Sequence, residues 1–339
     1  MNILNTPEYN FIRENEHLGD NIILLAYGGS KAYGTNLPTS DTDIRGIAVN
    51  SADEILLGKD FDQIVDVTTD TTIYSFTKMI KLLTSNNPNT IEILGCKPEH
   101  YLKITDIGKL ILDNKEIFLS KNVINTFGGY AHSQLRRLDN KSARSLEQAE
   151  HEKHVLNSIN NARYSFAQKY SDYSDDMVNL YIDASKNPEL DKEIFADIRI
   201  THYPLRDYLG MWSEMTNVIR DYDKVSKRNK QAVEHNKLSK HAMHLIRLFM
   251  MCIDILDKQE IITYRENEHD LLMAIRNNKN YEFIDENSQP TERFNKLVDD
   301  YQRRMDESAK TTKLPDKPNY KAIDELVKTV NKTIITRDI

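Results

Sequence analysis

The sequence has few cysteines and no long uninterrupted apolar run, and each shortage excludes a class of protein. It holds 2 cysteines in 339 residues. That number is too small for a disulfide framework or a cysteine-rich zinc site, and it is typical of a chain in a reducing compartment. The longest apolar stretch, LIRLFMMCIDIL, is interrupted by Arg247 and Asp254, which excludes a membrane span there. No basic-then-apolar segment opens the chain, so we expect a cytoplasmic protein.

The sequence also lacks an excess of basic residues. Its net charge is −7, and the first 120 residues carry all of it, because acidic and basic residues balance beyond residue 120. This charge gives no support for an extensive nucleic-acid-binding surface. An acidic N-terminal part joined to a balanced C-terminal part is consistent with a cation-binding domain followed by a domain of different character.

Strand patterns are confined to the first third of the chain. Residues 21–27 and 43–49 are short apolar runs that predict buried strands, and β-branched alternation over 63–76 predicts a third strand or a hairpin. Beyond this part the apolar spacing is helical. We therefore expect an α+β protein, with a small mixed β-sheet core and flanking helices over residues 1–120. An all-α helical domain over residues 121–339 would follow and close the active-site cleft.

Local signals assign two further segments. Asn87 is suited to cap a helix, and Pro88 is suited to its first position. The segment 171–200 is polar, so we interpret it as an insertion or as a loop over the active site.

The most informative stretch is GGSKAYGTNLPTSDTDIRG, which joins the first two predicted strands. Asp41 and Asp43 share one face if residue 41 is already extended, and a hard divalent cation such as Mg²⁺ would offset their repulsion. Gly29 lets the backbone approach a phosphate, and Ser30 adds a donor. Alone, each motif is more often a turn or a cap. In this order, between two buried strands, they predict a site for a nucleoside triphosphate.

A second pattern lies in the predicted helix over residues 238–256. On a helical wheel, Lys240, His244 and Arg247 form a narrow cationic stripe, and most of the remaining circumference is apolar. Three cations cannot be buried without partners. The stripe therefore predicts a neighbouring cavity or anion, and a thin solvated edge of a packing helix is the alternative.

These motifs together resemble a known family. GGS followed by SDTDIRG is similar to the signature of the DNA polymerase β-like nucleotidyltransferases, in which a Gly-Ser pair on a short helix precedes an Asp-x-Asp that opens the next strand. The closer resemblance is to the branch of RNA-ligase-associated polymerase type. Further stretches within residues 24–276 carry it: GSKAYGT, with Lys31 where arginine is usual, NNPNTIEIL, KHAMHLIRL and LLMAIRN.

The resemblance implies the rest of the site. A third carboxylate is expected on a neighbouring strand, where Asp70 is preferred and Asp66 is the rival. Asp41, Asp43 and Asp70 would then be catalytic and bind two Mg²⁺ or Mn²⁺ ions. The residues expected to bind the nucleotide are Gly29, Ser30, Lys31, Tyr33, Lys240, His244 and Arg247.

Other candidates have weaker support. Glu92 and Arg276 are suggested by the resemblance alone. His269 and Asp270 form a dipeptide known from metal phosphohydrolases, but no second histidine pair at helical spacing supports it, so a helix start is the preferred interpretation.

The expected reaction is nucleotidyl transfer, in which an NTP such as ATP gives its NMP to an acceptor hydroxyl and pyrophosphate is released. An RNA end is the favoured acceptor, and a protein side chain or a small metabolite is the alternative. A nucleotide-binding regulator without turnover is a further alternative, against which the intact pair of Asp41 and Asp43 argues. No membrane partner is expected.

Overall fold

A computed structural model describes most of the chain. The described residues are 3–143, 176–184, 192–226 and 235–337, together with positions 157, 161, 166, 170, 173, 174 and 186. The chain divides into two compact units, of which the first comprises Met1–Leu135, Ser239–Asn280 and Glu292–Ile339, and the second comprises Arg136–Leu238 and Tyr281–Thr291. This division differs from the expected boundary at residue 120, because helices from the C-terminal part of the chain belong to the same unit as the N-terminal sheet.

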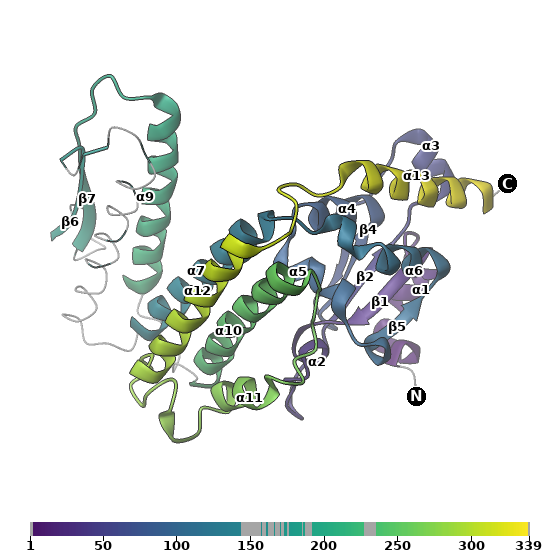
Figure 1. Ribbon diagram of the computed structural model, residues 1–339, viewed down its shortest axis with the longest axis horizontal. Helices are drawn as coiled ribbons and strands as arrows, with labels where there is room; N and C mark the ends of the chain where they lie inside the picture. Colours follow the sequence, from purple (N-terminus) through teal and green to yellow (C-terminus); the bar gives the residue numbers. More distant parts are fainter. Residues whose placement is uncertain are drawn as a thin grey trace. The chain divides into compact units, whose positions relative to one another are not determined.

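The first unit contains a mixed five-stranded sheet in the order β3-β4-β2-β1-β5 (Figure 1). Its strands are β1 (Ile22–Tyr27), β2 (Ile44–Ala48), β3 (Gln63–Asp66), β4 (Thr71–Ser75) and β5 (Tyr101–Ile104). β1 pairs antiparallel with β2 and β5, β3 pairs antiparallel with β4, and β2 runs parallel to β4. The predicted strands are thus confirmed, with the 63–76 segment forming the hairpin β3–β4, and β5 is an edge strand that the sequence pattern did not indicate.

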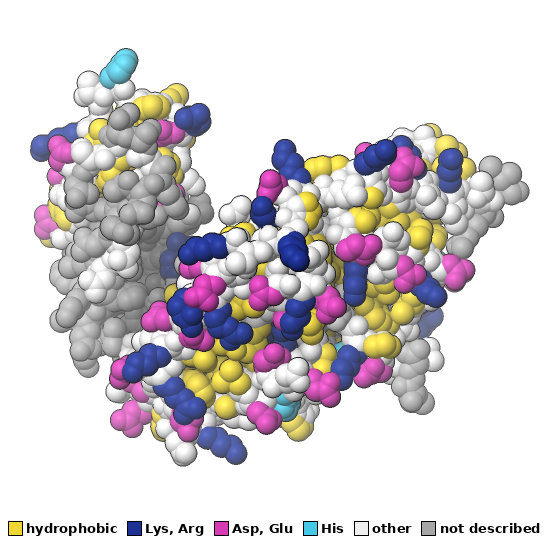
Figure 2. All heavy atoms as spheres, in the orientation of Figure 1, with side chains coloured by type: hydrophobic (Ala, Val, Ile, Leu, Met, Phe, Trp, Pro, Cys, Tyr) yellow, Lys and Arg dark blue, Asp and Glu magenta, His cyan; other side chains and the backbone are white. Residues whose placement is uncertain are grey.

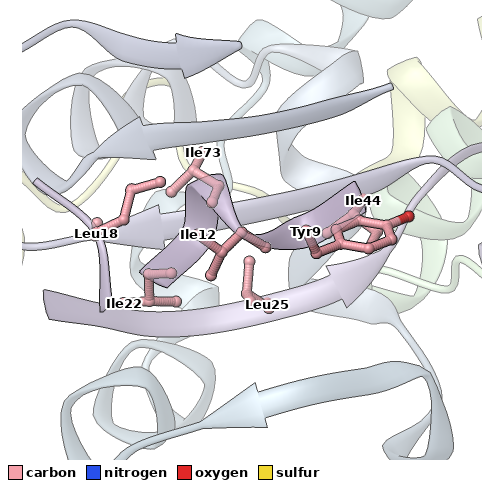
Figure 3. Packing of buried hydrophobic residues seen from close by; sticks show 8 residues of the cluster. Tyr9, Ile12, Leu18, Ile22, Leu25, Ile44 and Ile73 are labelled. Atoms are coloured by element: carbon pink, nitrogen blue, oxygen red, sulfur yellow. The ribbon is translucent and has the colours of Figure 1, made fainter. Parts of the chain in front are cut away.

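One face of this sheet is covered by the N-terminal segment. Tyr9 and Ile12 pack on side chains of the sheet, among them Leu25, Ile44 and Ile73 (Figure 3). Because successive side chains of a strand leave opposite faces, Arg45, next to Ile44, leaves the other face. The site described below lies on the side of the sheet that the N-terminal segment does not cover.

Helices complete the first unit. They are α1 (Phe11–Glu14), α2 (Gly29–Tyr33), α3 (Ala52–Leu57), α4 (Phe76–Thr84), α5 (Pro88–Ile91), α6 (Asp106–Asp113), α11 (His269–Asn277), α12 (Glu292–Thr311) and α13 (Tyr320–Arg337), with most of α7 (Asn122–Ala143) and α10 (His235–Lys258). The Asn87 side chain accepts a hydrogen bond from the Asn89 N–H at the start of α5, where Pro88 is the first residue, so the predicted cap is confirmed.

Ion pairs at its C-terminal end hold the long apolar helix α10 in place. Asp254 forms an ion pair with Arg265, which is only 1% exposed, and a second one with Lys258. The connection that follows α10 is fastened to the N-terminal part by the hydrogen bond from Arg265 N to Tyr33 O at 3.3 Å. The apolar face of α10 is thereby fixed in the interior of the first unit, which brings its predicted cationic stripe to α2.

The second unit contains the antiparallel hairpin of β6 (Val178–Ala184) and β7 (Lys192–Ile198) together with α9 (Leu205–Ser226). Its core includes Phe166, Val178 and Met211. The α+β class is confirmed, but the expectation of an all-α second part is corrected by this hairpin. The polar composition of the segment 171–200 predicts an insertion or a loop, yet the segment contains these two strands, in which the buried Val178 and Leu180 flank the exposed Asn179.

The surface of the first unit shows both signs of charge. In Figure 2 its acidic and basic side chains are interspersed over the visible face, with apolar side chains between them. Within the described part of the chain, no helix has the length and apolar character needed to cross a membrane.

Candidate active site

The parallel pairing of β2 and β4 brings two carboxylates together. Ile44 is the register partner of Thr71, so the residues immediately before them, Asp43 and Asp70, lie at the same edge of the sheet. The Ile44 N–H donates to the Asp70 carbonyl oxygen at 3.2 Å, and the side chains of Asp43 and Asp70 hydrogen-bond each other. Asp70 reaches this position with a φ of 45°, a left-handed conformation that aspartate tolerates better than most residues.

Asp66, the rival of Asp70, has a different place. It is paired with Thr71 at the end of the β3–β4 hairpin, and its Oδ1 accepts hydrogen bonds from the N–H and the hydroxyl of Thr69, both at 2.8 Å. These bonds hold the hairpin turn. Of the two candidates, the structure therefore brings Asp70, and not Asp66, to Asp43.

Asp41 and Asp43 both precede β2, which begins at Ile44. Asp43 is half-buried, whereas Asp41 is exposed, and among the described residues the three aspartates do not form a group placed to hold a metal ion. The Asp-x-Asp motif thus lies at the entrance of the strand and not within it.

Gly29 allows Asp43 to approach the start of α2. Gly29 has a φ of 51°, and a Cβ added there would lie 1.6 Å from Oδ2 of Asp43. Gly28 donates its N–H to the Asp43 carbonyl oxygen at 2.9 Å, and Ser30, which is half-buried, follows in α2. Any larger residue at position 29 would displace the Asp43 carboxylate, so the glycine is required by close approach.

The two carboxylates share one proton near neutral pH. Burial, followed by the hydrogen bond and the charge of Asp70, raises the pKa of Asp43 to about 7. The hydrogen bond with Asp43 lowers the pKa of Asp70, and Arg45 lowers it further. Arg45 donates to the Asp70 carbonyl oxygen at 2.7 Å and to its carboxylate at 3.2 Å. Lys240, which is exposed, lowers the pKa of both aspartates by its charge.

This shared proton predicts a pH-dependent stability. The native state binds the proton of Asp43 more tightly than the unfolded chain does, so the stabilising contribution is present at low pH and is lost as the pH rises through about 7. Asp43→Asn carries no such proton. In EDTA, we expect the free energy of unfolding of Asp43→Asn, relative to the wild type, to increase from pH 4 to pH 8 in urea titrations. A difference that stays constant over this range would contradict the shared proton.

Arg247 lies on the buried side of the α10 stripe. It is 7% exposed, and its guanidinium carbon lies 3.3 Å from the centroid of the Tyr33 ring. Tyr33 is itself 2% exposed, and its hydroxyl donates to Glu92. Burial raises the pKa of Glu92, and the charge of Arg247 and the hydrogen bond from Tyr33 lower it. Tyr33 is therefore placed to support Arg247, and its buried ring does not face solvent.

The contacts of His244 show that the stripe carries fewer positive charges than the sequence predicts. Its Nδ1 lies 2.7 Å from Nη2 of Arg247. Because a guanidinium has only donors, the Nδ1 atom must accept, and the imidazole is neutral. The His244 ring also contacts Tyr130 edge to face, at 5.7 Å between centroids. The stripe thus consists of two cations with a neutral histidine between them, and His244 orients Arg247.

Lys31 lies beside the aspartate loop. Its Nζ donates to Thr42 Oγ1 at 2.6 Å and lies 5.0 Å from the centroid of the Tyr27 ring. Since Thr42 separates Asp41 from Asp43, the Lys31 charge is held at this loop without an ion pair to either aspartate among the described contacts.

Two arginines of the site were not predicted from the residues. Arg45 lies two residues after Asp43, and the period of a strand could have placed both on one face. Arg276, suggested earlier by resemblance alone, donates from Nη2 to Ser40 Oγ at 3.0 Å, one residue before Asp41. No local signal indicates this contact, because 236 positions separate the two residues.

The carboxylates of Asp43 and Asp70 could provide some of the ligands that a divalent cation needs. The proton shared by Asp43 and Asp70 is the one that a metal ion would displace. Among the described residues, however, no group of three or more His, Cys, Asp or Glu side chains is placed to hold a metal ion. His269 and Asp270 are no exception, because they begin α11 at the surface, with Nδ1 of His269 3.4 Å from Oδ1 of Asp270.

The motifs around Gly29, Asp43 and Asp70 lie in the part of the chain that matches a known family. Residues 8–159 match the RlaP family, described as the RNA repair pathway DNA polymerase beta family. This match spans less than half of the chain, and it agrees with the resemblance that the sequence motifs carry. The matched region includes Asp41, Asp43 and Asp70, whereas the α10 stripe and Arg276 lie outside it.

One curated relative is informative. "Uncharacterized 38.9 kDa protein in nrdC-mobD intergenic region" of Enterobacteria phage T4 is 29% identical over 135 residues, which make up 36% of this chain and 40% of the phage protein. The match thus spans less than half of the relative's length. No solved structure matches the chain.

Proposed function

We propose that this protein transfers a nucleoside monophosphate from an NTP to an acceptor hydroxyl. The acceptor oxygen forms a bond to the α-phosphorus, the bond from that phosphorus to the bridging oxygen breaks, and pyrophosphate leaves with the electron pair. The hydroxyl proton passes to solvent. The observation that carries this proposal is the meeting of Asp43 and Asp70 next to Gly29, at the register set by Ile44 and Thr71.

Asp41, Asp43 and Asp70 would hold two Mg²⁺ or Mn²⁺ ions, with Asp41 turned inward. When bound, such ions lower the pKa of the attacking hydroxyl and neutralise the leaving pyrophosphate. Arg45 keeps Asp70 ionised and in place through its two hydrogen bonds. Gly29 and Ser30 would admit the phosphates to the carboxylates, and Lys240 would offset charge beside them.

The remaining nucleotide-binding residues support the triphosphate from α10 and α2. Arg247 would contact it directly, whereas Tyr33 and His244 would act through Arg247, since both touch its guanidinium. Lys31 would fix the aspartate loop through Thr42. An RNA end is the favoured acceptor, on the strength of the family's description.

The test is incubation with each α-labelled NTP, Mg²⁺ or Mn²⁺, and either bulk RNA or cell extract. Label in RNA supports the favoured acceptor, and label in protein or in a small molecule identifies the alternative. Binding of NTP without any labelled product would indicate a nucleotide-binding regulator instead of an enzyme.

Binding of metal and nucleotide should be coupled. The ion would bridge the carboxylates and the phosphates, so Mg²⁺ with a non-hydrolysable NTP should raise the melting temperature by more than the sum of the two separate shifts. Differential scanning calorimetry measures this directly. Asp43→Asn should lose the excess shift, and additive shifts in the wild type would contradict a shared site.

A further inference from the structure

Arg247 has an N–H group that meets no acceptor among the residues that the structure describes. Its Nη2 atom is taken by His244 at 2.7 Å, and its guanidinium plane covers the Tyr33 ring. Its Nε atom is buried and meets no acceptor within the described residues. A buried donor without an acceptor is costly, and a charged one costs more.

Arg276 has the same property from the neighbouring helix α11. Its Nη2 atom donates to Ser40, and its Nη1 atom is buried with no acceptor in the described part of the chain. Burial lowers the pKa of Arg276, and the positive charge of Arg247 lowers it further. Both arginines thus hold a buried N–H group that has no acceptor among the described residues, and the charge of one acts on the other.

Within the described part of the chain, Glu92 is the carboxylate whose charge acts on Arg247. Glu92 interacts with Arg247, but its carboxylate also accepts the hydroxyl of Tyr33. One carboxylate cannot neutralise two guanidinium groups or accept all of their unpaired N–H groups. An anion with several oxygens and two charges would do both.

We propose that Arg247 and Arg276 together form a binding site for a terminal phosphate group. Such a phosphate offers three outward oxygens and up to two negative charges, which suits two planar guanidinium groups. The inference rests on the proposed function in that the site adjoins the Asp-x-Asp loop through Ser40. The phosphate comes either from the outer end of the NTP or from a phosphorylated end of the acceptor.

The first experiment uses inorganic triphosphate in EDTA, so that no metal bridge contributes. Isothermal titration compares the wild type with Arg276→Gln and with the matched control Arg303→Gln, which removes the same charge from an exposed position on α12. We expect Arg276→Gln to weaken triphosphate binding about tenfold to hundredfold and Arg303→Gln to leave it unchanged. Equal affinities of all three proteins would overturn the inference.

Arg276→Lys keeps the charge and loses the planar fork. It should bind triphosphate with an affinity between those of the wild type and Arg276→Gln. If Arg276→Gln fails to fold, Arg276→Lys serves as the test. Wild-type affinity for triphosphate in Arg276→Lys would also overturn the inference.

Two further arms identify the source of the phosphate. If the site holds the outer phosphate of the NTP, Arg276→Gln should weaken binding of a non-hydrolysable ATP analogue more than that of AMP. If it holds the acceptor end, the variant should lose the preference for a 5′-phosphorylated over a 5′-hydroxyl oligonucleotide. If Arg276→Gln keeps both preferences, the phosphate site is contradicted.

The test of the phosphate site can succeed or fail independently of the test of the proposed function. Triphosphate binding in EDTA that depends on Arg276, in a protein that transfers no label, supports the phosphate site and contradicts the enzyme. If the protein transfers label but its affinity for triphosphate does not depend on Arg276, the enzyme is supported and the phosphate site is contradicted.

Discussion

Asp43→Asn is expected to lower the rate of label transfer about 10³-fold or more, since a lost metal-binding carboxylate removes several kcal/mol of transition-state stabilisation. The protein should remain folded. The side chain of Asp43 lies against the Asp70 carboxylate, and the amide of asparagine can donate to that carboxylate in place of the shared proton. Asp41→Ala and Asp70→Asn should have effects of the same order. Transfer is measured with the α-labelled NTP that proves active.

The matched control is Asp66→Asn. It removes the same charge from a carboxylate that lies in the hairpin before the same strand, where the side chain accepts from Thr69. Transfer by Asp66→Asn should stay near that of the wild type, with a small loss of stability at most. A stronger defect in Asp66→Asn than in Asp70→Asn would reverse the assignment of the third carboxylate, and near-normal transfer by Asp43→Asn would end the metal-site proposal.

Arg247→Ala is expected to weaken NTP binding by about 1.5–3 kcal/mol, the range for a hydrogen bond to a charged group. The guanidinium is held in place by Tyr33 below and His244 at one side, so little ordering is needed when a phosphate binds. Lysine at position 247 should restore only part of the affinity, because it lacks the bidentate fork. Titration with a non-hydrolysable NTP in Mg²⁺ measures both variants.

Arg304→Ala controls for the loss of a stacked arginine. Its guanidinium carbon lies 4.9 Å from the centroid of the Tyr301 ring on α12, at an exposed position, and its removal should leave NTP affinity unchanged. If Arg247→Ala binds NTP normally but transfers no label, Arg247 contacts the acceptor instead. If it binds and transfers like the wild type, Arg247 has no part in the site.

Local patterns in the sequence were sufficient for much of the fold. The apolar runs that became β1 and β2 are bounded by glycine and aspartate, and burial of whole short strands leaves few alternatives for such runs. Asn87 and Pro88 act within one turn of helix, so their cap depends on no distant residue. The apolar circumference of α10 likewise predicted a buried helix, and Leu245 and Phe249 are in the core.

Hairpins were harder to predict. The strands β6 and β7 are polar on one side and lie in a segment rich in Asp and Ser. This polar composition favours a loop, and the alternation of apolar and polar residues at the start of β6 is too short to predict a strand against it. β5 is short and lies at an edge of the sheet, where only part of its surface is buried. In both cases pairing with another strand, and not the segment itself, determines the conformation.

The sequence by itself determined that Asp41 and Asp43 stand beside a glycine turn and that Lys240, His244 and Arg247 share a helix face, because both patterns follow from backbone periodicity. Only the tertiary structure decided that Asp70 and not Asp66 joins Asp43, since the choice depends on a register between parallel strands. It also decided that His244 is neutral and that Arg276 donates to Ser40 beside the aspartate loop. Protonation and charge pairing depend on which distant groups are brought within hydrogen-bonding distance and how far water is excluded there.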